Sequence, residues 1–82
     1  MLEELIKLIS DKSIQYEYID QNNVILFNNG IKIKVSYNIN TYTLSNIGKC
    51  YINKRYLTHY YNRHNLAHII INIFNINDIE NY

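Results

Sequence analysis

The chain of 82 residues carries a formal net charge of +1, with 48% hydrophobic and 18% charged residues. This composition indicates one small folded domain over residues 1–82 and excludes a highly charged disordered segment. A single cysteine, Cys50, excludes an intrachain disulfide, and no apolar run is long enough to span a membrane. The acidic start lacks the basic region of an export signal, so we expect an intracellular, cytoplasmic protein and no membrane partner.

The first predicted element is an amphipathic helix that begins at the N-terminus and ends near Lys12. Its apolar residues recur with helical spacing and form one stripe: Leu2, Leu5, Ile6 and Ile9. Acidic residues occupy its first turn and lysines come later, which suits the helix dipole.

Alternation of apolar and polar residues predicts a first strand from Ile14 to Tyr18, followed by a polar turn at residues 20–23. Residues 24–27 and 31–37 then flank Asn29-Gly30, a pair that favours a type I′ hairpin turn. This turn pairs Leu26 with Ile33 and Val24 with Val35 on one face, and Lys32 and Lys34 project from the other. Residues 38–40 form the next turn, and residues 41–45 form a fourth strand.

The pattern weakens after Gly48. Ile52, Tyr56 and Tyr60 have the spacing of a helix face, but strand plus loop remains open for residues 49–62. Asn62 is a candidate cap for a last helix, whose buried stripe is Leu66, Ile69, Ile70 and Ile73. The rival for this segment is a strand, because residues 69–71 are β-branched. We expect the polar tail after about residue 75 to be frayed.

The predicted fold class is therefore α+β. It comprises an N-terminal helix, a four-stranded antiparallel meander with its hairpin turn at Asn29-Gly30, and one or two C-terminal helices packed on one face.

Charge is unevenly distributed along the chain, because no Asp or Glu occurs in residues 21–77. That stretch contains six cations: Lys32, Lys34, Lys49, Lys54, Arg55 and Arg63. A positive surface of this kind attracts a polyanion or an acidic protein.

The segment from Lys49 to His68 is the sharpest candidate for binding, since its cations alternate with tyrosines and histidines. Cations neutralise phosphates, and tyrosine rings stack on unpaired bases. The candidate residues are Lys49, Tyr51, Lys54, Arg55, Tyr56, His59, Tyr60, Arg63 and His64. Lys32 and Lys34 could extend this surface. In the alternative interpretation, the tyrosines pack as half-buried core and the cations are merely solvated.

Neither a metal site nor catalysis is expected. Potential metal ligands are scattered over the chain (Cys50, His59, His64 and His68), unlike the tight pairs of zinc sites. The two glycines cannot form a phosphate-cradling loop, and no acid lies near the histidines in sequence. A metal-independent ribonuclease using one of these histidines is the least implausible chemistry. We therefore expect no cofactor and no catalytic residues.

Isoleucine, asparagine and tyrosine supply nearly half of the chain, which indicates a very A/T-rich genome such as that of a phage or other mobile element. We expect a small non-catalytic binding protein that engages a nucleic acid, or a nucleoprotein or acidic protein target. An inhibitor of host defence of the anti-CRISPR type is one example. The alternative is a protein-interaction or homodimerisation module that uses a strand edge or the exposed Ile25 and Phe27 of the hairpin.

Overall fold

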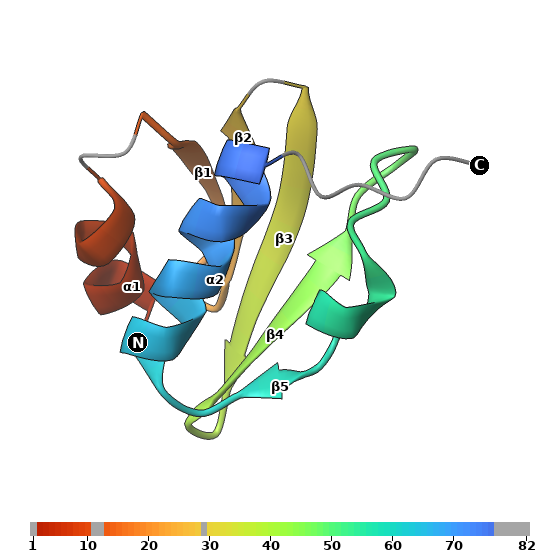
Figure 1. Cartoon of the computed structure of the whole chain (residues 1–82). Helices are drawn as coiled ribbons and strands as arrows, with labels where there is room; N and C mark the ends of the chain where they lie inside the picture. The colour runs from red at the N-terminus through yellow and green to blue at the C-terminus, as the bar shows by residue number, and fades with distance from the viewer. Residues whose placement is uncertain (1, 11–12, 29, 77–82) are drawn as a thin grey trace.

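The computed structural model describes residues 2–10, 13–28 and 30–76, and it confirms the α+β class (Figure 1). In chain order the elements are α1 (Leu2–Ile9), β1 (Gln15–Asp20), β2 (Asn23–Asn28), β3 (Ile31–Asn38), β4 (Thr41–Asn46), the 3-10 turn η1 (Lys54–Tyr56), β5 (His59–Tyr60) and α2 (Arg63–Ile76). The sheet has five strands instead of the predicted four. The additional strand, β5, has two residues, too few to leave an alternation pattern in the sequence.

The sheet is an antiparallel meander in which the strands lie in chain order. The predicted register of the β2–β3 hairpin is confirmed, because Leu26 pairs with Ile33 and Val24 pairs with Val35. Gly30 has a φ of 81°, a conformation that glycine adopts without strain. Asn29, the other residue of the predicted turn, lies outside the described residues.

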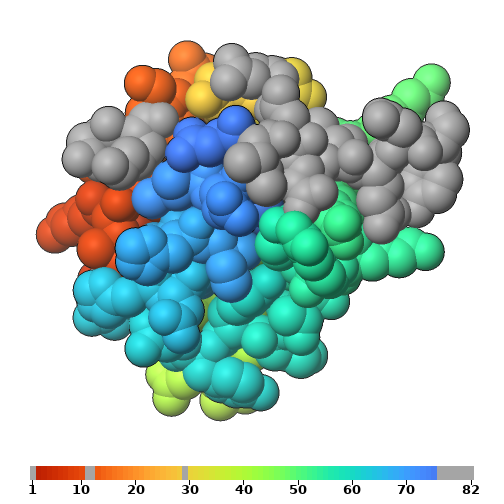
Figure 2. Space-filling model, viewed as in Figure 1, coloured from red at the N-terminus to blue at the C-terminus, as the bar shows by residue number. Residues whose placement is uncertain are grey.

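Both helices cover the same face of the sheet, and Figure 1 shows them side by side in front of the strands. In the space-filling view of this side, α2 fills the centre and the strands emerge at the upper and lower edges (Figure 2). The core between these layers contains the predicted apolar stripe of α1 and the inward residues of the hairpin. All four stripe residues of α1 are buried. The helix ends at Ile9, earlier than predicted. Its predicted end, Lys12, lies outside the described residues.

Helix α2 confirms the helical alternative for the last apolar segment. The Asn62 side-chain oxygen accepts hydrogen bonds from the backbone N–H groups of His64 and Asn65, at 2.8 and 3.2 Å. These bonds satisfy N–H donors that the first turn of the helix leaves unpaired. Asn62 therefore caps α2, as predicted. Leu66, Ile70 and Ile73 are fully buried, and Ile69 is half-buried. The expected fraying of the tail falls mainly on residues 77–82, outside the described part of the chain.

Residues 49–62 contain no α-helix, so the spacing of the apolar positions in this segment does not reflect a helix face. Ile52 and Tyr56 are buried, but a loop, η1 and β5 bring them to the core instead. The Asn53 side chain accepts from the Arg55 N–H and caps this short 3-10 turn. Within the described residues, no helix is both long and apolar enough to cross a membrane.

The turn between β3 and β4 contains an unusual residue. Ile39 and Asn40 both have positive φ, 47° and 58°, as a type I′ turn requires. Asparagine tolerates this region, but a β-branched side chain is strained there. The isoleucine side chain is also 83% exposed, so packing within the chain does not offset the strain.

Candidate functional site

The face of the sheet opposite the helices provides the candidate site. Because Leu26, Ile33 and Leu44 point into the core, the alternate residues of β2, β3 and β4 point to the other side. The strand register aligns these side chains with residues of β1 and β5 in three rows across the sheet. The rows are Gln15, Phe27 and Lys32; Glu17, Ile25, Lys34 and Ser45; and Asn23, Ser36, Thr43 and His59. We refer to this surface as the helix-free face.

A hollow of about 650 Å³ lies at one end of the helix-free face. Its floor includes the row of Gln15, Phe27 and Lys32, and residues 47–50 form a wall beside it. This wall is a tight turn closed by the hydrogen bond from the Cys50 N–H to the Ile47 carbonyl at 3.0 Å. The Cys50 sulfur accepts from the backbone N–H of Lys32 at 3.1 Å, which fixes the turn against the start of β3.

The hollow is positively charged. Lys32 and Lys49 both line it, and none of the described lining residues is acidic. Both side chains are exposed, and neither has an ion pair or side-chain hydrogen bond to another described residue. The site therefore combines two accessible ammonium groups with an aromatic ring, the half-buried Phe27.

The opposite end of the helix-free face is already satisfied by its own polar groups. The N–H of Asn22 donates to Asp20 at 2.8 Å, and the Asn23 side-chain amide donates to the same carboxylate at 3.0 Å. These bonds hold the pKa of Asp20 below its ordinary value, and the charge of Lys34 lowers it further. The Ser36 hydroxyl then donates to the Asn23 side-chain oxygen at 2.6 Å. This end is therefore a closed polar network, unlike the hollow.

The predicted tyrosine platform does not form at its centre, because Tyr56 is only 7% exposed and belongs to the core. The Arg55 guanidinium lies 4.9 Å from the centre of the Tyr56 ring and donates to its hydroxyl at 2.8 Å. The half-buried Tyr60 donates through its hydroxyl to the Tyr56 carbonyl at 2.9 Å. Burial raises the pKa of Tyr60, and the nearby Tyr56 raises it further by a smaller amount. Tyr56 and Tyr60 thus make internal contacts, as the alternative interpretation expects of buried and half-buried tyrosines.

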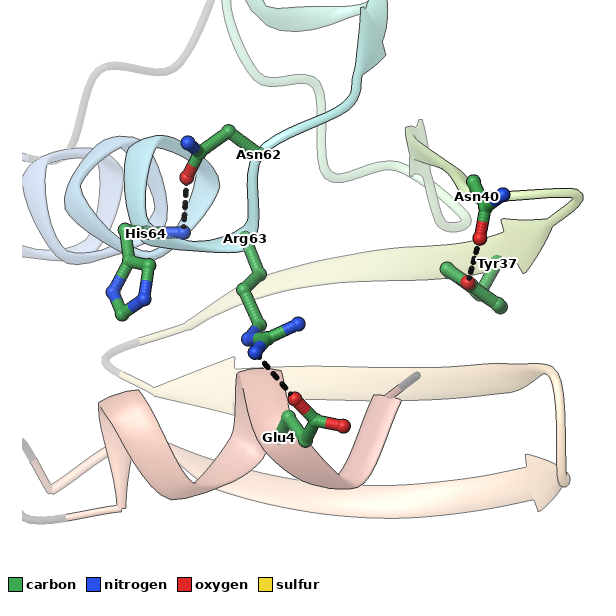
Figure 3. A network of polar contacts seen from close by, with 6 residues as sticks. All are labelled: Glu4, Tyr37, Asn40, Asn62, Arg63 and His64. Carbon is green, nitrogen blue, oxygen red and sulfur yellow. Dashed lines mark hydrogen bonds and ion pairs between the residues drawn. The ribbon is translucent and has the colours of Figure 1, made fainter.

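One predicted binding cation is neutralised by an acid from the other end of the chain. Arg63, at the start of α2, forms an ion pair with Glu4 of α1 at 2.6 Å (Figure 3). The two helices lie side by side, so folding brings the acidic N-terminal segment against the basic middle. The charge asymmetry of the sequence is therefore partly lost in the folded chain.

The remaining candidates are dispersed. Tyr51, Lys54 and His64 are exposed in the loop after β4, in η1 and in α2, respectively. His59 lies on the helix-free face opposite Thr43. Of the predicted site residues, the fold thus brings Lys32 and Lys49 together at the hollow and places Lys34 and His59 on the same face.

Neither the positions nor the partners of the candidate metal ligands indicate a metal centre. No group of three His, Cys, Asp or Glu residues that could hold an ion occurs in the described part of the chain. His64 and His68 lie one turn apart on α2, and both are exposed to solvent.

The sequence pattern does not predict Gln15 as part of the site, and it indicates Phe27 only as a possible protein contact. The register of β1 against β2 aligns them with Lys32, and that register includes an irregularity between Tyr18 and Asp20. No local pattern in the sequence reports this irregularity. The approach of residues 47–50 to β3 is likewise a tertiary contact.

No protein-family model matches this chain, and searches of curated proteins and of solved structures return no significant match. Function has therefore to be inferred from the residues of the chain itself.

Proposed function

We propose that this is a small non-catalytic binding protein that engages a nucleic acid, free or within a nucleoprotein, through its helix-free face. One observation carries the proposal: the fold gathers Lys32, Lys34 and Lys49 on the side of the sheet that no described helix covers. The residues proposed to bind are these lysines with Phe27 and His59.

The chemistry of these groups suits phosphate. Lysine ammonium groups neutralise phosphates and release counterions, which supplies most of the sequence-independent affinity for nucleic acid. An exposed antiparallel sheet also presents its side chains in regular rows, over which an extended polymer can lie. The chain is short and rich in amino acids with A/T-rich codons, so we propose that it originates from a mobile element. The proposed setting is inhibition of host defence of the anti-CRISPR type.

The test is the salt dependence of binding. Fluorescence polarisation would measure binding to labelled single- and double-stranded DNA and RNA at several concentrations between about 50 and 200 mM salt. We expect Lys32→Gln, Lys34→Gln and Lys49→Gln each to reduce the slope of log K against log salt by roughly 0.7–0.9. Lys7→Gln is the matched control, because Lys7 is an exposed lysine of α1 on the helix side.

The proposal is contradicted by two results. One is equal weakening by Lys7→Gln and by the three variants on the helix-free face. The other is the absence of binding to all four nucleic acids.

A second candidate function is supported by the edge strand β1. All six of its residues are exposed, including Ile19 at 57% and Tyr16 at 48%. An open edge with apolar side chains can accept a strand from a partner or from a second copy of this chain. This alternative predicts self-association that barely responds to salt and is lost in Ile19→Lys, as measured by sedimentation.

A further inference from the structure

We infer that the hollow holds one unpaired nucleotide of a single-stranded nucleic acid, with its base against Phe27 and its phosphate near Lys32 and Lys49. This inference rests on the proposed function and specifies its ligand. It identifies the place on the helix-free face where stacking, in addition to charge, contributes to binding.

The register places the aromatic ring at the centre of the site. Phe27 pairs with Gln15 on one side and Lys32 on the other, and neighbouring strands lie about 4.8 Å apart. A base stacked on Phe27 would therefore have an amide on one side and an ammonium on the other. The amide of Gln15 offers both a donor and an acceptor to the base edge. The ammonium of Lys32 can reach the phosphate.

The size of the hollow and the presence of Phe27 in it favour a single strand over a duplex. The hollow is open to solvent, and its volume of about 650 Å³ is within the range of clefts that accept a small molecule, roughly 300–1,000 Å³. The bases of a duplex are stacked on each other and cannot lie against Phe27 unless one is extruded, which costs unstacking energy. An unpaired base is free to stack on an aromatic side chain.

Lys34 extends the site by one step along β3. It lies two residues from Lys32 on the same face, and that spacing is about 6.7 Å in a strand. Successive phosphates of an extended single strand are separated by a comparable distance. The next phosphate can therefore lie over Lys34, which marks the limit of the positive part of the helix-free face, because Glu17 lies in the same row and Asp20 is near.

Cys50 provides a direct test in the unmodified protein, because it is the only cysteine and it lines the hollow. Its rate of reaction with a soluble aromatic disulfide would be measured with no ligand, and then with saturating single-stranded RNA, single-stranded DNA or duplex of the same length. We expect single strands to slow the reaction at least fivefold and duplex to leave it nearly unchanged.

The second measurement removes the stacking surface. Phe27→Leu should weaken single-strand binding about tenfold, because stacking of one base on an aromatic ring contributes roughly 5- to 150-fold. The matched control is Tyr16→Leu, which removes an exposed aromatic ring from the helix side of β1. Circular dichroism would verify that both variants are folded, and the protection of Cys50 needs no variant.

The outcomes separate this inference from the proposed function. Protection of Cys50 together with loss of affinity in Phe27→Leu supports it, and the polymer that binds more tightly identifies RNA or DNA as the source. Salt-dependent binding that leaves Cys50 unprotected and is insensitive to Phe27→Leu overturns the nucleotide site but leaves the proposed function standing. Equal affinity for duplex and single strand also overturns it. Binding only to an acidic protein overturns both.

Discussion

The two faces of the sheet are built from alternate residues of the same strands, but they have different roles. On the helix side, Leu26 and Ile33 are fully buried beneath α1 and α2. On the helix-free face, their neighbours Phe27 and Lys32 remain accessible and line a hollow. A small domain depends for its stability on the first face. Its second face contributes less to the core and is the face that we propose for binding.

The largest contrast between the faces should appear in core truncations. Leu26→Ala should lower the free energy of unfolding by about 2–5 kcal/mol, because it leaves a cavity in a closely packed layer. Ile25 directly precedes Leu26 and lies on the helix-free face. Ile25→Ala should lower the free energy of unfolding by roughly 1 kcal/mol, because this side chain is only half-buried. Urea denaturation measures both.

A domain of this size has a small stability margin, so a volume-conserving pair of variants keeps this comparison measurable if Leu26→Ala does not fold. Leu26→Met and Ile25→Met should both remain folded at a cost below about 1.5 kcal/mol each, and the cost should be larger at the fully buried Leu26 than at the half-buried Ile25. Equal destabilisation by the two alanine variants would contradict the distinction between the faces.

A smaller effect is expected from the cap of the helix that covers the core. Asn62→Ala should lower the free energy of unfolding by about 1 kcal/mol, because two N–H groups of α2 lose their acceptor. Asn72→Ala is the matched control, since Asn72 is exposed within the same helix and alanine is a better helix former there. A thermal midpoint of Asn62→Ala at or above that of the control would show that the cap does not stabilise this layer.

Local patterns predicted much of the helix-covered face. The stripe of α1, the hairpin register and the Asn62 cap depend on residues close in sequence, and all three are confirmed. The site depends on contacts between distant segments. The approach of Cys50 to Lys32 and the pairing of Arg63 with Glu4 have no local signature. For this reason the sequence predicts one binding surface over the segment from Lys49 to His68, whereas the structure places Lys49 at the hollow and Arg63 against α1.

The ion pair that joins the two covering helices should contribute less than the cap. Both side chains of the Glu4–Arg63 pair are 43% exposed, and exposed pairs typically contribute about 0.2–1 kcal/mol. A double-mutant cycle with Glu4→Gln and Arg63→Gln measures this coupling through urea denaturation. It should shrink in about 1 M salt, where surface charges are screened. A coupling that does not respond to salt would indicate contact by packing instead of charge.

The smallest expected effect comes from the polar end of the helix-free face and depends on pH. The N–H of Asn22 and the amide of Asn23 lower the pKa of Asp20, so the folded state favours its ionised form. This contribution to stability is complete above the ordinary pKa of the carboxyl group and is lost as pH falls through the lowered folded value. Asp20→Asn retains an oxygen that can accept from Asn22 but removes the charge. The variant should therefore be less stable than the parent protein near neutral pH and should approach it in acid. Denaturation at about pH 7 and about pH 2.5 measures this convergence. A difference that stays constant between the two conditions would show that the Asp20 charge plays no part in stabilising the turn.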